Sequence, residues 1–247
     1  MKKRIWRAVA AYVFNSAGFV FVLSEDFKEK LIKIGVSENK ILVTTTFFHK
    51  NNIFKKVDNE NKAAIPGLVF LGRLSEIKGI DDMLHALSEV KLEGYDFQCK
   101  VIGHGDAPGV VEKYEELSKE LNIDDCVHFL GRKTGEEKFL LLTQSDVFVF
   151  PSHMEGCPTS VIEALATGLF VVSSDVGALK DLINKDNGLT VRAKDRQALA
   201  SAIRVSLCNI DNIRCSHENI SKFAHEKYEV GTVSENFICA YRKLMSS

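Results

Sequence analysis

The stretch SDVFVFPSHMEGCPTSVIEALATG, residues 145–168, joins a wholly apolar run to an amphipathic one through a bend of small and polar residues. The run DVFVF predicts a strand that is buried on both faces. The run SVIEALATG predicts a helix with Thr159 or Ser160 as its N-cap. Glu155 is therefore expected at the carboxyl end of a buried strand, and Glu163 in the first turns of the helix that follows.

The same order of strand and helix repeats on both sides of this stretch. The further pairs are LVFLG with IDDMLHALSEV, CKVIGHG with GVVEKYEELSKELN, VHFLG with GEEKFLLLTQS, LFVVSS with ALKDLIN, and GLTV with DRQALASAIRVSL. Repeated units of this kind require a parallel sheet with right-handed helical crossovers. The expected fold class is α/β, a Rossmann-like doubly wound parallel sheet, in which ligands bind beyond the carboxyl ends of the strands.

A polar stretch, HKNNIFKKVDNENKAAIPG, precedes the first of these units and is typical of an interdomain linker. It divides the chain into an N-terminal helix and strand preface with its linker, residues 1–66, and a Rossmann-like domain with a C-terminal helix, residues 67–247. Within the preface we expect a helix over 4–14, a strand over 19–23, and a second helix that Ser24 caps.

The first residues raise the alternative of a signal peptide or membrane anchor, because three basic residues precede an apolar run from Ala8 to Leu23. Asn15, Ser16 and Gly18 interrupt that run, which is also shorter than the ~20 apolar residues needed to cross a bilayer. A helix followed by a buried strand fits better, and we expect a cytoplasmic protein.

Overall composition excludes several classes of function. Lys and Arg number 32 against 33 Asp and Glu, so no general polyanion-binding surface is indicated and nucleic-acid binding is not expected. The six cysteines lack CxxC spacing, which favours a reducing compartment. The sequence has no cluster of metal-ligating residues, so no metal site is expected. Any anionic ligand must be held by local groups.

Two loops at predicted strand ends could hold such a ligand. In GRLSEIKG, which begins at Gly72, Arg73 and Lys78 lead into a helix N-terminus and could cradle a diphosphate, although a solvated turn with surface charges explains the segment as well. In GHGD, Gly103 and Gly105 allow close approach of a ligand to the backbone. The third glycine of the dinucleotide fingerprint is missing, so nicotinamide binding is disfavoured.

The two acids of the opening stretch also have two interpretations each. Glu163 could complete a capping box with Ser160, and Glu155 could be a solvated loop residue. In the functional interpretation their carboxylates accept hydrogen bonds from sugar hydroxyls, while backbone N–H groups at the helix start receive a pyrophosphate. One stretch could thus hold both sugars and both phosphates of a sugar nucleotide.

The segments FLGRLSEIKGIDDMLHAL, VIGHGD, VHFLGR, SDVFVFPSHMEGCPTSVIEALATG, VVSSDVG and NGLTV, in this order, resemble the donor-binding half of the retaining GT-B nucleotide-sugar glycosyltransferases of the group 1, family 4 type. The resemblance extends from about Val20 to the C-terminus. It implies transfer of a hexose from a UDP- or GDP-sugar to a glycan or lipid-linked acceptor. It also implies no cofactor and no metal, since two cations stabilise the leaving diphosphate.

The resemblance assigns roles to particular residues. Arg73, Lys78 and Glu155 are the implied catalytic groups: the two cations bind the diphosphate and Glu155 faces the transferred sugar. Glu163 would contact the ribose and Arg132 would lie near the base. The remaining implied substrate-binding residues act largely through small size or main-chain groups; they are Gly72, Gly103, Gly105, Gly156, Cys157, Thr159 and Ser160.

Two departures from the family pattern limit what the resemblance implies. The resemblance covers no acceptor domain, so we expect activity only with an acceptor half on another chain or upstream. Peripheral contact with the inner membrane face is expected to come from that half. The segment VTTTFFHKNN, from Val43, replaces the usual Pro-Asn-Gly turn and is expected to change the linker without touching the donor site. Alternatives are a truncated sugar-nucleotide-binding protein without transferase activity and a sugar-nucleotide epimerase or hydrolase.

Overall fold

The fold was taken from a computed structural model, which describes residues 2–49 and 64–245. Its main feature is a six-stranded sheet in the order β5-β4-β3-β6-β7-β8. All neighbouring strands in this sheet are parallel. The strands are β3 (Gly67–Leu71), β4 (Gln98–Ile102), β5 (Val127–Phe129), β6 (Val147–Phe150), β7 (Phe170–Ser174) and β8 (Gly188–Val191). The predicted doubly wound α/β sheet is confirmed.

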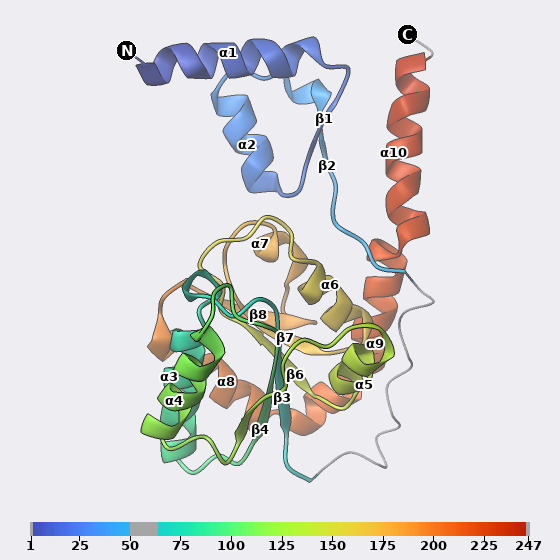
Figure 1. The fold of residues 1–247 in the computed structure, drawn as a ribbon. Helices are drawn as coiled ribbons and strands as arrows, with labels where there is room; N and C mark the ends of the chain where they lie inside the picture. Colours follow the sequence, from blue (N-terminus) through green and yellow to red (C-terminus); the bar gives the residue numbers. More distant parts are fainter. Residues whose placement is uncertain (1, 50–63, 246–247) are drawn as a thin grey trace.

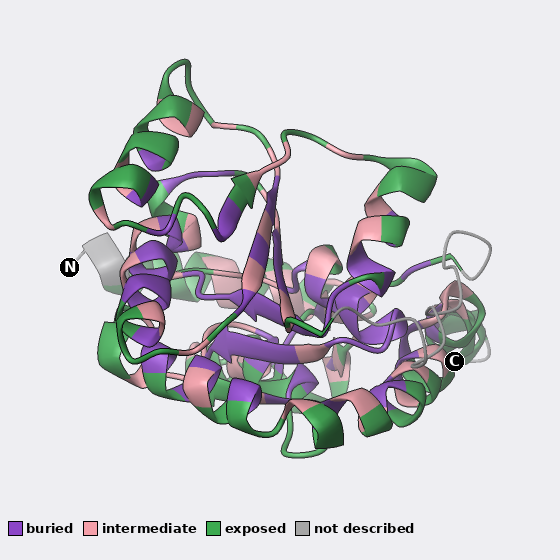
Figure 2. Ribbon diagram, turned by 90° about the horizontal axis from the view of Figure 1, so that it is seen from below, coloured by how far each residue is buried: buried purple, intermediate pink, exposed green. Residues whose placement is uncertain are grey.

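Helices cover both faces of this sheet (Figure 1). On one side lie α3 (Ile80–Leu92), α4 (Val110–Glu120) and α8 (Arg196–Cys208), and on the other lie α5 (Gly135–Thr143), α6 (Thr159–Ala166) and α9 (Ile210–Tyr228). The short helix α7 (Leu179–Leu182) precedes β8. Because both faces are covered, β6 and the three inner residues of β3 are buried, and Figure 2 shows buried residues in purple.

The order of the strands creates a switch point between β3 and β6. From β3 the chain proceeds to β4 and β5 on one side, whereas from β6 it proceeds to β7 and β8 on the other. The two central strands are in register at Leu68 with Val147, and the rings of Phe70 and Phe150 stack across them at 5.8 Å. In open α/β sheets a crevice forms at this point, outside the carboxyl ends of the strands.

The N-terminal residues form a second, smaller parallel sheet of β1 (Val20–Val22) and β2 (Ile41–Val43). It is accompanied by α1 (Lys2–Ser16), α2 (Glu25–Lys33) and the 3-10 turn η1 (Glu38–Lys40). Ser24 caps α2 as predicted, since its Oγ accepts a hydrogen bond from the Phe27 N–H at 3.2 Å. The expected linker falls largely on residues 50–63, which lie outside the described residues.

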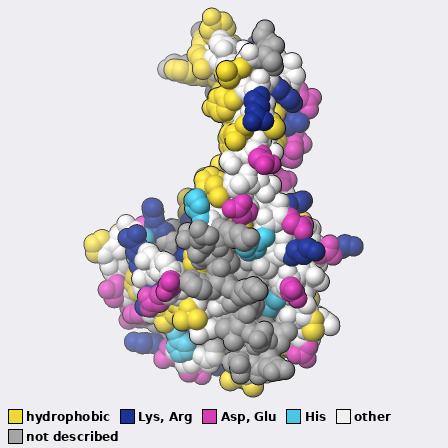
Figure 3. Space-filling view, turned by 90° about the vertical axis from the view of Figure 1, so that its right-hand side faces the viewer, with side chains coloured by type: hydrophobic (Ala, Val, Ile, Leu, Met, Phe, Trp, Pro, Cys, Tyr) yellow, Lys and Arg dark blue, Asp and Glu magenta, His cyan; other side chains and the backbone are white. Residues whose placement is uncertain are grey.

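The last helix, α10 (Val230–Met245), extends away from the large sheet and packs beside the small one (Figure 1). The Phe237 ring lies 4.5 Å from the Phe21 ring of β1. At the start of α10, Val230 N–H donates to the carbonyl of Phe48 at 3.0 Å, which joins the two chain segments between the sheets. Hydrophobic side chains gather at this end of the molecule (Figure 3), and Trp6 of α1 is 71% exposed.

Candidate functional site

The loops that follow β3 and β6 face each other at the switch point. The first contains the 3-10 turn η4 (Glu76–Lys78) and leads into α3; the second leads into α6. Lys78 Nζ at the end of η4 donates a hydrogen bond to Glu155 Oε1 in the second loop. Lys78 Nζ also lies 5.4 Å from the centre of the Phe150 ring. Strand order thus brings together a cation and a carboxylate that are 77 positions apart.

Backbone contacts fix the two loops against each other. The His153 N–H donates to the carbonyl of Ile77 at 2.8 Å, and Ser152 Oγ donates to the same carbonyl at 3.1 Å. Where the two loops meet, Gly79 has a φ of 69°, and a Cβ on this residue would overlap the carbonyl oxygen of Pro151. Only glycine fits this position without strain, so the Lys-Gly pair in GRLSEIKG has a steric basis.

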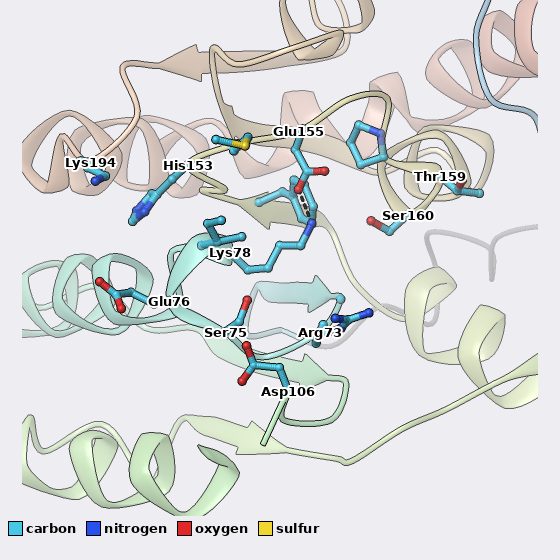
Figure 4. A pocket seen from close by; sticks show the side chains of 15 residues that line it. Arg73, Ser75, Glu76, Lys78, Asp106, His153, Glu155, Thr159, Ser160 and Lys194 are labelled. Carbon is cyan, nitrogen blue, oxygen red and sulfur yellow. Dashed lines mark hydrogen bonds and ion pairs between the residues drawn. The ribbon is translucent and has the colours of Figure 1, made fainter. Parts of the chain in front are cut away.

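A cavity of about 960 Å³ opens between these loops. Six of the residues predicted for the site line it: Gly72, Arg73, Lys78, Glu155, Thr159 and Ser160. Figure 4 shows the Lys78–Glu155 pair at its centre, with Arg73, Thr159 and Ser160 toward one end and His153 and Lys194 toward the other. A volume of this size suits a ligand as large as a sugar nucleotide.

A smaller cavity of about 230 Å³ adjoins the first, because Gly72 and Arg73 line both. Gly103 and Arg132 of the predicted site line this second cavity. A Cβ at Gly103 would overlap the carbonyl oxygen of Gly72, so glycine is required where the loops after β3 and β4 meet.

Four predicted residues line neither cavity: Gly105, Gly156, Cys157 and Glu163. Gly156 is nevertheless in the bend, where its carbonyl accepts the Ala178 N–H at 2.8 Å. Gly105 pairs with Leu74 in an isolated parallel bridge. The roles assigned to these four residues stay predictions.

The start of α6 differs from the local prediction. The N-cap is Pro158, and no side chain caps the helix. The carboxylate of Glu163 accepts a hydrogen bond from Lys138 Nζ of α5 at 2.7 Å. The capping-box alternative is therefore wrong for Glu163, and so is the choice of Thr159 or Ser160 as the cap: both lie inside the helix.

The segment that departs from the family pattern contacts the predicted site, contrary to expectation. Thr45 Oγ1 lies 3.3 Å from Cys157 Sγ, and Thr46 Oγ1 lies 3.4 Å from both the sulfur and the carbonyl oxygen of Cys157. The thiol of Cys157 is buried between them. The prediction that this segment leaves the donor site untouched is wrong, because the chain passes directly over the Gly-Cys-Pro bend.

Two partners of the cavity residue His153, Asp82 and Arg196, were not predicted from the sequence. His153 Nε2 lies 2.6 Å from Asp82 Oδ2 of α3, and Asp82 Oδ1 accepts a hydrogen bond from Arg196 Nε at 2.6 Å. Burial raises the pKa of the Asp82 carboxyl, but the hydrogen bonds from Arg196 and His153 outweigh it, so that pKa is lowered. Spacing alone could not reveal this cluster, since its members come from three separate elements.

The described residues contain neither a metal-binding cluster nor a membrane-spanning helix. Within 2–49 and 64–245, no group of three His, Cys, Asp or Glu side chains is placed to hold a metal ion. In the same ranges, no helix combines the length and the apolar character needed to cross a membrane.

The doubly wound parallel sheet, with a second small parallel sheet beside it, has the fold of one half of a GT-B glycosyltransferase. The family model described as "Glycosyl transferases group 1" matches residues 65–209, and the chain belongs to this family. The resemblance noted in the sequence is confirmed.

Among curated proteins, the chain is similar to the amylovoran biosynthesis glycosyltransferase AmsK of Erwinia amylovora. They are 30% identical over 198 residues, which are 77% of this chain and 48% of that protein. It is also similar to the MMP alpha-(1->4)-mannosyltransferase of Mycolicibacterium hassiacum, at 27% identity over 69% of this chain and 41% of that protein. The chain thus spans about half the length of these relatives.

Solved structures agree on the fold. A sucrose-phosphate synthase from Thermosynechococcus elongatus matches with a TM-score of 0.82 and 24% identity, over 97% of this chain and 61% of that one. The Anabaena protein Alr3699/HepE, solved in complex with UDP, matches with a TM-score of 0.83 and 19% identity, over 99% of this chain and 68% of that one. At such identities the likeness shows a shared fold alone.

Proposed function

We propose that the chain is the donor-binding half of a hexosyltransferase, which binds a UDP- or GDP-hexose for transfer to a glycan or lipid-linked acceptor in polysaccharide or glycoconjugate synthesis. The observation that carries the proposal is the position of Arg73, Lys78 and Glu155 around one cavity at the switch point of the sheet. The names of a relative in amylovoran biosynthesis and of a neighbour that binds UDP support it.

The chemistry of the proposed site is electrostatic. Arg73, Lys78 and the first N–H groups of α6 would bind the diphosphate and stabilise the charge that develops on it as the sugar leaves. Lys78 donates a hydrogen bond to one carboxylate oxygen of Glu155, so Glu155 would orient the ammonium group and present its other oxygen to a sugar hydroxyl. Retention of anomeric configuration and independence of metal ions are parts of this proposal that follow from the family resemblance.

The acceptor half is proposed to lie outside these residues, on another chain or elsewhere on a longer one. The chain matches 61% of the synthase and 48% of the amylovoran enzyme, which leaves a large part of each without a counterpart. The apolar side chains exposed on α1, among them Trp6 and Tyr12, are a surface that such a half could cover. Peripheral membrane contact is proposed to belong to that half as well.

Calorimetric titration of the chain with UDP, GDP, UDP-glucose and GDP-mannose tests the proposal. Saturable binding of one nucleotide and its conjugate is expected. Glu163→Ala should weaken it if Glu163 contacts the ribose, whereas Glu137→Ala, which removes an exposed α5 acid paired with Lys133, should not. Absence of binding by every nucleotide at millimolar concentration would refute the proposed function.

Transfer itself is tested separately from binding. The chain is mixed with a conjugate that binds, first alone and then with the acceptor half of a relative, and release of free nucleotide diphosphate is measured. Turnover only in the mixture would support a divided enzyme. Binding with no turnover in either case would indicate a sugar-nucleotide-binding protein instead.

A further inference from the structure

Among the described residues, one ring nitrogen of His153 has a hydrogen-bond partner and the other has none. Its Nε2 contacts Asp82 Oδ2 at 2.6 Å, while Nδ1 has no partner in the part of the chain that the structure describes. The side chain is 15% exposed and lines the larger cavity. A fixed ring with one free nitrogen at a cavity wall is arranged to contact a ligand.

The contacts of Asp82 determine which nitrogen of His153 carries the proton. Asp82 is buried, and its carboxylate accepts hydrogen bonds but cannot donate them when ionised. Arg196 occupies Oδ1 as a donor and also binds Asp81, which anchors it at the start of α8. Oδ2 therefore accepts from Nε2–H, and Nδ1 of the neutral ring is an acceptor.

The two adjoining cavities indicate which part of a sugar nucleotide would reach His153. The smaller cavity, with Arg132, meets the larger one at Gly72 and Arg73. If Arg73 and Lys78 bind the diphosphate, the nucleoside extends toward the Arg132 side and the sugar extends the other way. Figure 4 shows His153 beyond the Lys78–Glu155 pair, away from Arg73, Thr159 and Ser160.

We infer that His153 is a sugar-recognition residue, whose Nδ1 accepts a hydrogen bond from a hydroxyl of the transferred hexose. Asp82, itself held by Arg196, is a positioning residue that fixes the Nε2–H tautomer. This inference rests on the proposed function and adds to it a specificity determinant on the sugar side of the diphosphate.

The first test compares free nucleotide with its sugar conjugate. Calorimetry on the parent chain uses UDP, GDP, UDP-glucose, UDP-galactose and GDP-mannose, and the conjugate that binds most tightly is retained. His153→Ala should weaken that conjugate roughly 2- to 12-fold, the value of one hydrogen bond, and leave the free nucleotide unchanged. His128→Ala, which removes an exposed histidine of β5, is the control and should change neither affinity.

The outcomes separate this inference from the proposed function. If no nucleotide binds the parent chain, the proposed function fails. If nucleotides bind but His153→Ala weakens conjugate and free nucleotide equally, or weakens neither, the role of His153 in sugar recognition is wrong. Equal affinity of the parent for every conjugate and its free nucleotide would overturn it as well.

The second test measures which ring nitrogen of His153 carries the proton. If Asp82 served only to hold the structure, replacing it would not be expected to move that proton. Nitrogen-15 spectra of histidine-labelled protein should show His153 with the proton on Nε2. In Asp82→Asn the amide oxygen must face the Arg196 donor, so the NH₂ group faces His153 and the ring proton should move to Nδ1. A parent chain with the proton on Nδ1 would contradict the inference even if the Asp82 variant did not fold.

Discussion

Lys78→Ala tests the centre of the proposed donor site, and the structure sets the size of the expected effect. The Lys78 side chain is 23% exposed beside a Glu155 side chain that is 9% exposed, so the ion pair lies in a partly desolvated place. A hydrogen bond to a charged group contributes about 1.5–3 kcal/mol. Loss of one such bond to the diphosphate should therefore weaken UDP or GDP binding roughly 10- to 150-fold.

The same substitution has a second effect that can be separated from the first. Without Lys78, Glu155 keeps its charge beside the bound diphosphate and repels it. Lys78→Ala/Glu155→Gln should therefore bind nucleotide more tightly than Lys78→Ala alone, although less tightly than the parent. The two side chains contact each other, so their effects on affinity are not expected to add. A gain of affinity in the double variant over Lys78→Ala is expected if the Glu155 carboxylate faces the bound diphosphate.

Isothermal titration with the nucleotide that the parent binds measures both effects, and urea unfolding verifies that each variant is folded. Lys91→Ala is the matched control, because Lys91 also pairs with a carboxylate, Asp125, but at the opposite end of α3. An affinity in Lys78→Ala equal to that of the parent would show that the loop after β3 is not the diphosphate site.

Three further predictions concern stability and use urea or thermal unfolding. Gly103→Ala should destabilise the fold by at least about 1–3 kcal/mol, because the new Cβ would overlap the Gly72 carbonyl oxygen; an unchanged midpoint would contradict this steric reading. Arg214→Leu should cost about 3–5 kcal/mol, since it removes a donor at 3.0 Å from the buried carboxylate of Asp146. The pKa of Asp82 is lowered in the folded protein, so its ionised carboxylate should contribute stability that is fully present above about pH 4, the pKa range of an unfolded carboxyl. That stability should be lost as the pH falls through the lower folded pKa. The free energy of unfolding of Asp82→Asn should therefore depend less on acid pH than that of the parent.

The sheet could be predicted because its two central strands, β3 and β6, are apolar runs that helices bury on both faces. A strand buried on both faces does not alternate between apolar and polar residues. Its sequence is instead a continuous apolar run, such as VFVF in β6. The order of the strands could not be predicted, since nothing local in a strand specifies its neighbour. Strand order, however, is what brings Lys78 to Glu155, so the pairing of two correctly chosen residues emerged only from the fold.

Errors and omissions in the site have a common cause. The capping box at Ser160 was a sound local pattern, but Lys138 of a neighbouring helix supplies Glu163 with a stronger, charged partner. Asp82 was missed because an acid in the first turn of a helix is already explained by the helix dipole. Its contacts with His153 and Arg196 join positions 71 and 114 apart in sequence, beyond the reach of any motif.

The Gly-Cys-Pro bend is held from three sides, which bears on how an acceptor half could influence the donor site. Ile77 fixes the residues before it, and Gly177, with a φ of 55°, packs so closely that a Cβ would overlap the Glu155 carbonyl oxygen. On the third side, Thr46 of the N-terminal segment contacts the carbonyl and thiol of Cys157. This segment continues directly from the small sheet, against which we expect an acceptor half to pack. A displacement of that half would therefore be transmitted to Cys157 through Thr46. The conformation of the Gly-Cys-Pro bend should change with the position of the acceptor half, even where no residue of that half contacts the nucleotide.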